Sequence, residues 1–113
     1  MTGAIPEVDV AGLPAELPDE LTVLDVREDD EWVAGHVEGA LHIPLMQVPQ
    51  RIADVPTGTQ VLVVCKVGGR SAQATAFLQS KGVDAVNLEG GMLAWQRAGR
   101  PLRSETNAPP AVI

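Results

Sequence analysis

The chain has 113 residues and only 3% aromatic residues, which suits one compact domain whose core is built mainly from aliphatic side chains. A formal net charge of −7 argues against nucleic acid and anionic membranes as partners, because both carry negative charge. The single cysteine excludes an internal disulfide, and no apolar stretch approaches the ~20 residues that cross a bilayer.

Five apolar runs are predicted to be β-strands. The second run, TVLDV, is apolar almost throughout, which is typical of a strand that is buried on both faces. The fourth, QVLVV, is the clearest of the five. In chain order, the predicted strands are residues 8–10, 22–26, 40–43, 60–64 and 85–88.

Helix signals lie between these runs. Acidic residues 28–31 place negative charge where the helix macrodipole favours it, and Gly35 is predicted to end that helix. Apolar residues in the segment 45–52 recur at helical spacing, but the proline within this segment keeps any helix short or irregular. The clearest helix is 71–81, capped by a glycine, and a last one is predicted at 92–97.

Strands that alternate with short helices predict an α/β fold with a mainly parallel sheet. We expect residues 1–7 to be a loose lead-in and residues 8–102 to form the domain. Residues 103–113 have no apolar period and contain two adjacent prolines, so we expect a flexible tail or one laid loosely on the surface.

The chain's only cysteine lies where a predicted strand ends and the clearest helix begins, in the run CKVGGRS (65–71). Ligands gather at the carboxyl ends of strands in open α/β sheets. Two glycines let backbone N–H groups turn inward, and such groups beside a helix N-terminus bind anions. A thiolate is an anion, and these neighbours lower a cysteine pKa from ~8.5 to about 3.5–7.5. Cys65 is therefore a candidate nucleophile.

Other interpretations compete with this one. A lone cysteine after a buried strand is often only a small core residue. A Walker loop requires a glycine five positions before Gly69, where Val64 stands. Phosphatases of the tyrosine-phosphatase type have five residues between cysteine and arginine, whereas four separate Cys65 from Arg70. The shorter loop favours one extra sulfur atom on the cysteine over a phosphoryl group.

Four blocks together resemble the rhodanese family, specifically its single-domain sulfurtransferases. They cover roughly residues 8 to 102 and read VLDVRE, E-x-x-x-GHVEGALHIP, CKVGGRS and NLEGGMLAWQRAGRPL. The resemblance implies a five-stranded parallel sheet with helices on both faces. It also implies that Cys65 accepts a sulfur atom, holds it as a persulfide and passes it to an acceptor. The loop that would surround this sulfur is Lys66, Val67, Gly68, Gly69, Arg70 and Ser71.

The resemblance also suggests substrates and partners. The expected donor is a small anion such as thiosulfate, or a persulfide, because the loop lacks the Gly-Val-Thr ending of relatives that use mercaptopyruvate. The expected acceptor is a thiol or cyanide, and a sulfur-relay protein is a possible partner. Lys66 and Arg70 are basic on an acidic chain and fit a dianion, although Arg70 could instead pair with a carboxylate.

Two residues are predicted to support the site. Asp25 and Arg27 lie at the carboxyl end of the second strand, where the carboxylate could accept hydrogen bonds from loop N–H groups. Alternatively, Arg27 pairs with Glu31 at helical spacing and Asp25 begins the helix. Trp32 and Trp95 are expected to be packing residues.

No cofactor and no metal are predicted, because one thiol and two separated histidines lack the convergent ligands of a metal site. The single cysteine and the absence of a basic, apolar N-terminal leader favour a cytoplasmic protein. Two further functions stay open: a sulfur-delivery or sulfur-sensing module with little free turnover, and a cysteine-dependent phosphatase or arsenate reductase.

Overall fold

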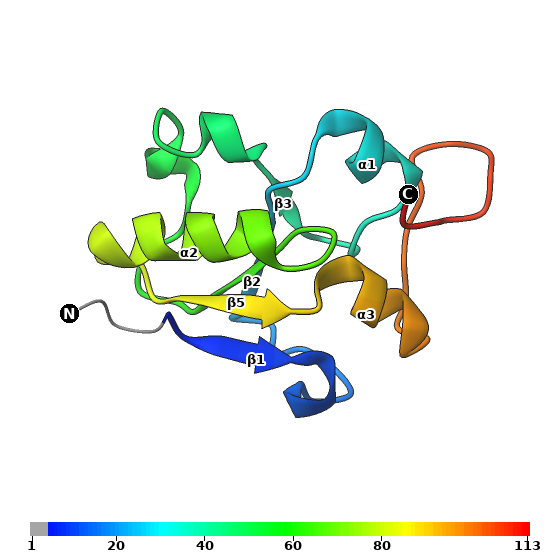
Figure 1. The fold of residues 1–113 in the computed structure, drawn as a ribbon, viewed down its shortest axis with the longest axis horizontal. Helices are drawn as coiled ribbons and strands as arrows, with labels where there is room; N and C mark the ends of the chain where they lie inside the picture. Colours follow the sequence, from blue (N-terminus) through cyan, green and yellow to red (C-terminus); the bar gives the residue numbers. More distant parts are fainter. Residues whose placement is uncertain (1–4) are drawn as a thin grey trace.

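Five parallel strands form one sheet at the centre of the computed structural model, which describes residues 5–113 (Figure 1). The strand order is β1-β5-β4-β2-β3. The predicted α/β class and five-stranded parallel sheet are confirmed. Residues 1–4 of the predicted lead-in lie outside the described part. The strands are β1 Glu7–Asp9, β2 Thr22–Asp25, β3 Leu41–His42, β4 Val61–Val64 and β5 Ala85–Glu89.

β4 is the central strand, and all four of its residues are buried. Its side chains alternate between the two faces of the sheet, because successive residues of a strand point in opposite directions. Val61 and Val63 belong to one apolar cluster, whereas Leu62 and Val64 belong to the other. The continuous apolar run in the sequence therefore reflects a strand with protein on both faces.

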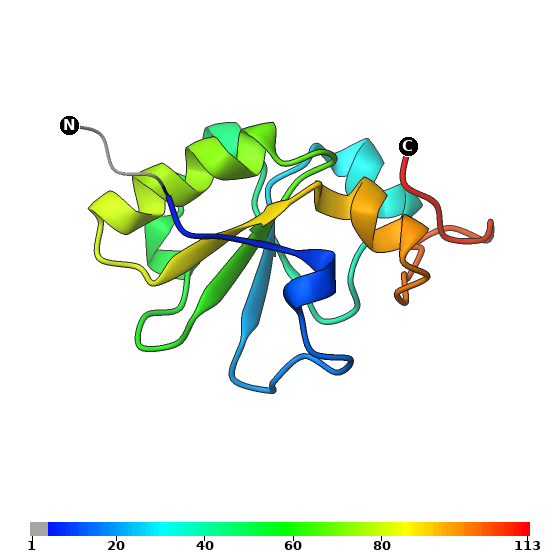
Figure 2. The ribbon, with the colours of Figure 1, turned by 60° about the horizontal axis from the view of Figure 1, so that its bottom comes forward.

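Helices cover both faces, as predicted. α2 (Gly69–Ser80) lies along one face, where Ala74 and Leu78 are buried against the sheet (Figure 2). α3 (Gly91–Arg97) packs Met92 and Trp95 against the opposite face. α1 (Asp29–Ala34) follows β2, and its first turn carries three of the predicted acidic residues.

One helical prediction agrees with the structure and another differs in detail. The segment 45–52 contains the short 3-10 turn Leu45–Gln47, and a second one, Ile52–Asp54, begins at its last residue, which agrees with the irregular helix expected there. α2 begins at Gly69 rather than at residue 71. It begins earlier because Gly68 takes a φ of 110°, a left-handed conformation that lets the chain turn directly from the loop into the helix.

The C-terminal segment 103–113 lies beside α1. Arg103 and His36 exchange two backbone hydrogen bonds of 2.8 and 2.9 Å, and the Ala111 N–H donates to the Ala34 carbonyl at 3.0 Å. Val112 packs against the apolar cluster on the α3 face. These contacts place the segment on the surface, and its flexibility stays a prediction. Within residues 5–113, no helix combines the length and the apolar character needed to cross a membrane.

Gly35 ends α1 as predicted, but its φ of 177° is extended backbone that any residue adopts. The need for glycine comes from packing instead. A Cβ atom at this position would lie 2.5 Å from the carbonyl oxygen of Ala111.

We therefore expect Gly35→Ala to lower the free energy of unfolding by about 1–3 kcal/mol, the usual cost of overpacking. Chemical denaturation measures this change. In a chain that ends at residue 110, the same substitution should cost much less, because the overlapping residue is gone. An equal cost in both chains would show that the Ala111 contact is not the reason for glycine.

Candidate functional site: a cradle around Cys65

Cys65 lies directly after β4, at the carboxyl edge of the sheet and between β2 and β5. The residue is only 1% exposed. The Val26 N–H donates to the Val64 carbonyl at 3.0 Å, so the sheet is hydrogen-bonded up to the residue before the cysteine. The strand thus holds the Cys65 backbone in a fixed place, and the loop 66–68 turns around its sulfur atom.

Hydrogen-bond donors converge on the Cys65 Sγ. The Gly68 N–H lies 3.1 Å from it and the Ser71 hydroxyl 3.2 Å from it. Burial raises the pKa of the Cys65 thiol, but the Ser71 hydroxyl and the N–H groups of Ser71, Gly68 and Val67 outweigh this effect and lower the pKa below its ordinary value. The site therefore stabilises the thiolate form of Cys65 relative to a free cysteine.

The N-terminus of α3 explains why the loop turns its N–H groups toward the sulfur. The Met92 N–H donates to the Cys65 carbonyl at 2.8 Å, and the Leu93 N–H donates to the Lys66 carbonyl at 3.0 Å. Two loop carbonyls are thus directed away from Sγ. Gly91 has a φ of 57°, and a Cβ there would overlap the Cys65 and Lys66 carbonyls. The sequence did not predict this contact between Gly91 and the loop.

Asn87 also holds the loop, and the sequence reading missed it. Its side-chain N–H donates to the Gly68 carbonyl at 3.3 Å and to the Glu7 carboxylate at 2.8 Å. Asn87 is 1% exposed, in the middle of β5. A buried amide in an otherwise apolar run was the available signal, because buried polar groups require partners.

Arg70 pairs with a carboxylate rather than standing free. Its guanidinium donates two hydrogen bonds to the Glu31 carboxylate, at 2.7 and 2.9 Å. Hydrogen bonding from Arg70 lowers the pKa of Glu31 from 4.5 to about 2 despite partial burial, and Glu31 in turn raises the pKa of Arg70. This ion pair joins α1 to the first turn of α2. A functional role for Glu31 was not predicted.

Asp25 and Arg27 form a buried ion pair, with Nη2 and Oδ2 2.7 Å apart and both side chains fully buried. The Asp25 carboxylate also accepts the Arg27 backbone N–H at 3.0 Å, and Arg27 Nη2 donates to the Gly35 carbonyl at 2.7 Å. Both predicted alternatives therefore name the wrong partners. Asp25 bonds Arg27 and not the N–H groups of the loop after Cys65, and Arg27 does not pair with Glu31. The pair instead fixes the connection from β2 to α1.

The remaining predicted residues lie in or near the loop. Lys66 is half-buried, and Val67 is 60% exposed at the tip of the loop.

The tryptophans and His36 are packing residues. The ring of Trp32 stacks on those of His36 and His42, with ring centroids 3.6 and 4.7 Å away. The His36 Nε2 lies 2.7 Å from Glu105, so this ring takes part in packing and in holding the C-terminal segment. Trp95 is 3% exposed and packs in the interior.

Removing one donor tests the thiolate environment. We expect Ser71→Ala to slow alkylation of Cys65 by iodoacetamide about tenfold near neutral pH, since a hydrogen bond to a charged group contributes about 1.5 kcal/mol or more. The rates of the variant and the parent should converge at high pH, where both thiols are ionised. Ser80→Ala, at the exposed end of α2, is the matched control. If the pH dependence of the alkylation rate is the same in Ser71→Ala and the parent, Ser71 does not contribute to the activation of Cys65.

The Glu31–Arg70 pair predicts a specific acid dependence of stability. Because the folded-state pKa of Glu31 is about 2, its contribution is complete above about pH 4.5 and is lost as the pH falls toward 2. We expect Glu31→Gln to lower the free energy of unfolding by about 1 kcal/mol at pH 7, since this partly exposed pair is screened by solvent. The difference from the parent should shrink below pH 4. Asp30→Asn, on the same turn, should leave the acid profile unchanged.

Comparison with known proteins agrees with this geometry. The model of the family described as Rhodanese-like domain matches residues 11–98. A sulfurtransferase from Allochromatium vinosum is 35% identical over 99 residues, which cover 85% of this chain and 92% of that protein.

Solved structures show the same fold. A rhodanese-related protein from Thermoplasma volcanium has a TM-score of 0.81 and 32% identity, covering 87% of this chain and 97% of that chain. A rhodanese-like domain protein from Staphylococcus aureus has a TM-score of 0.77 and 30% identity, covering 90% of this chain and 100% of that chain. The chain therefore belongs to the rhodanese-like domain family, and its kind of chemistry is sulfur transfer.

Proposed function

We propose that the protein moves a sulfane sulfur from thiosulfate or a persulfide donor to a thiol or cyanide through a persulfide on Cys65. The observation that carries this proposal is the convergence of the Gly68 N–H and the Ser71 hydroxyl on a single buried sulfur atom. Such donors stabilise the thiolate before transfer. They can equally stabilise the negative terminal sulfur of a persulfide, which is also an anion.

The transfer needs no redox partner. The Cys65 thiolate attacks the outer sulfur of thiosulfate, an S–S bond forms, and the S–S bond of thiosulfate breaks so that sulfite leaves with the electron pair. Cyanide or a thiolate then attacks the terminal sulfur of the persulfide. The second S–S bond breaks, the acceptor leaves with the sulfur atom, and the Cys65 thiolate is restored.

The size of the loop favours sulfur over phosphate. Four residues separate Cys65 from Arg70, and the loop donors lie 3.1–3.2 Å from the Sγ itself. Donors this close to the cysteine suit one additional atom more than a phosphorus with three oxygens. The phosphatase and arsenate reductase alternatives are therefore less favoured by the geometry.

We assign different roles to the two basic residues of the loop. The charge of Arg70 is already balanced by Glu31, so Arg70 shapes the loop and is a weaker candidate for binding the donor. Lys66 and the N–H groups of residues 67–71 are then the groups that attract a dianion. The acidic surface elsewhere repels such a donor, which leaves this loop as its preferred contact.

A sulfur-delivery module that works mainly with a partner protein is the second candidate. Val67 favours it, because an apolar side chain that is 60% exposed at the tip of the loop suits contact with a protein better than contact with thiosulfate. Turnover with small donors, compared with turnover with a persulfidated protein, separates the two. A cytoplasmic location stays a prediction.

We expect thiosulfate treatment to add one sulfur atom to the intact protein, and cyanide to remove it. Cys65→Ser should gain no sulfur and lose sulfur transfer, because a hydroxyl cannot form a persulfide. Intact-mass spectrometry measures both results, and circular dichroism checks that the variant is folded. Since Cys65 is the only cysteine, the adduct has one possible site.

Two results would contradict the proposal. Retention of sulfur transfer by Cys65→Ser would place the chemistry elsewhere. Hydrolysis of an aryl phosphate by the parent chain, lost in the variant, would favour the phosphatase instead.

A further inference from the structure

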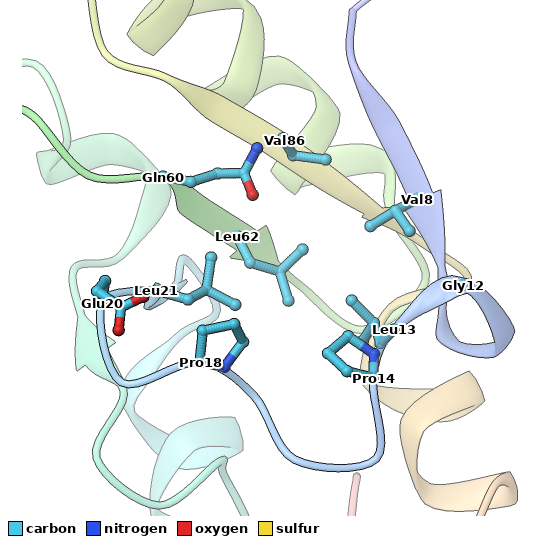
Figure 3. A pocket seen from close by; sticks show the side chains of 10 residues that line it. All are labelled: Val8, Gly12, Leu13, Pro14, Pro18, Glu20, Leu21, Gln60, Leu62 and Val86. Atoms are coloured by element: carbon cyan, nitrogen blue, oxygen red, sulfur yellow. The ribbon is translucent and has the colours of Figure 1, made fainter.

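An apolar groove of about 540 Å³ lies on the face of the sheet opposite α2 (Figure 3). Leu62 of β4 and Val86 of β5 form its floor. Val8 stands on one side, and Leu13 and Leu21 come from the connection between β1 and β2. The volume lies in the range of ~300–1,000 Å³ that is typical of clefts that bind ligands.

The groove exists because an irregular connection, rather than a second helix, covers the amino ends of the strands on this face. Parallel sheets usually have helices on both faces. Here α3 covers the carboxyl ends of the strands, whereas the connection 10–21 crosses the amino ends and forms a single short 3-10 turn, Val10–Gly12 (Figure 2). Pro14 and Pro18 lie within this connection and disfavour a helix there. Leu13 and Leu21 of the connection pack against this face, so that Leu62 is only 2% exposed, and the groove remains beside them.

The outer wall of the groove is held in place from behind. Arg100 donates hydrogen bonds to the carbonyls of Leu13, Pro14 and Ala15, at 3.1, 2.7 and 3.4 Å. Its guanidinium also lies 5.2 Å from the centre of the Trp95 ring. The positive charge of Arg100 is thus directed at backbone carbonyls and at α3. The wall is preformed, which reduces the entropy that a binding partner must overcome.

The rim of the groove is acidic. Residues 1–26 contain six Asp or Glu residues and no Lys or Arg. Three of them, Glu16, Asp19 and Glu20, are exposed on the connection that forms the wall, and Glu20 lines the groove itself. A second copy of the chain fits poorly, because a two-fold contact would bring two acidic rims together.

We propose that this groove binds a basic amphipathic helix of a partner protein. The apolar face of the helix contacts half-buried side chains that line the groove, which are Val8, Leu13, Leu21 and Val86. The Lys or Arg residues of the helix face Glu16, Asp19 and Glu20. This is the helix-in-groove mode of recognition. The site goes beyond the sulfur-transfer proposal and does not depend on it.

The groove is separate from the cysteine. Leu62 precedes Cys65 by three residues, or about 10 Å along the strand, and points to the opposite face. A helix bound here leaves the loop 65–71 open to its substrates. Binding is therefore expected to be the same in Cys65→Ser, so a failure of the sulfur-transfer proposal would not affect it.

The test uses two synthetic peptides of about 15 residues, the length at which an isolated helix becomes stable in water. Both carry leucines on one face; the other face carries lysines in one peptide and glutamates in the other. We expect the Leu/Lys peptide to bind the full chain at one saturable site, with the largest NMR amide shifts around Leu21, Leu62 and Val86. The Leu/Glu peptide should bind at least about tenfold more weakly, because like charges in an interface are unfavourable.

A charge-reversed variant identifies the rim. Glu16→Lys combined with Glu20→Lys should weaken binding of the Leu/Lys peptide about tenfold or more and strengthen binding of the Leu/Glu peptide. Asp30→Lys with Glu89→Lys makes the same change in net charge at the carboxyl end of the strands and should leave both affinities nearly unchanged. Both variants alter exposed side chains, so the fold is expected to persist.

Four outcomes would overturn the proposal. The first is no binding of the Leu/Lys peptide, and the second is amide shifts that lie away from the groove. The third is equal loss of binding in both charge-reversed variants, which would indicate a general attraction to an acidic chain. The fourth is self-association of the peptide-free protein through the groove, which would assign the site to a second copy.

Discussion

The orientation of the peptide groups after Cys65 is the constraint on which the site depends. A loop can direct its N–H groups toward a sulfur atom only if its carbonyls are satisfied elsewhere, because buried carbonyls need partners. The first turn of α3 provides those partners for Cys65 and Lys66, and Asn87 bonds the Gly68 carbonyl. The cradle is therefore built jointly by β4, β5 and α3, although the residues that touch the sulfur come from one short run.

A second set of contacts fixes the opposite side of the loop. The buried ion pair of Asp25 and Arg27 shapes the connection from β2 into α1, and α1 carries Glu31 to Arg70. Because the Arg70 charge is balanced there, the anion-binding character of the loop comes mainly from backbone N–H groups and Lys66. Such fixed dipoles need little reorganisation when a sulfur atom arrives, which is the main advantage of a preorganised site.

The two faces of the sheet differ in how they are covered. Along the α2 face, the helix and two 3-10 turns bury a continuous aliphatic cluster. On the α3 face, the helix stabilises the loop at the carboxyl ends of the strands and leaves the amino ends to a proline-containing connection. The candidate site and the groove therefore lie at opposite ends of the same strands, so a partner bound at one need not obstruct the other.

The sequence by itself determined the strands, the clear helix and the position of the candidate cysteine, because apolar runs, glycine caps and the CKVGGRS loop are local patterns. QVLVV predicts a buried strand from its own composition, and β4 is buried throughout. The tertiary structure alone decided the partners of the charged and polar residues. Glu31 reaches Arg70 from 39 positions away, and Asn87 reaches Gly68 from 19 positions away. Gly35 is required by Ala111, which lies far along the chain. No local pattern in the sequence predicts such contacts, because they form only when the sheet brings distant segments together.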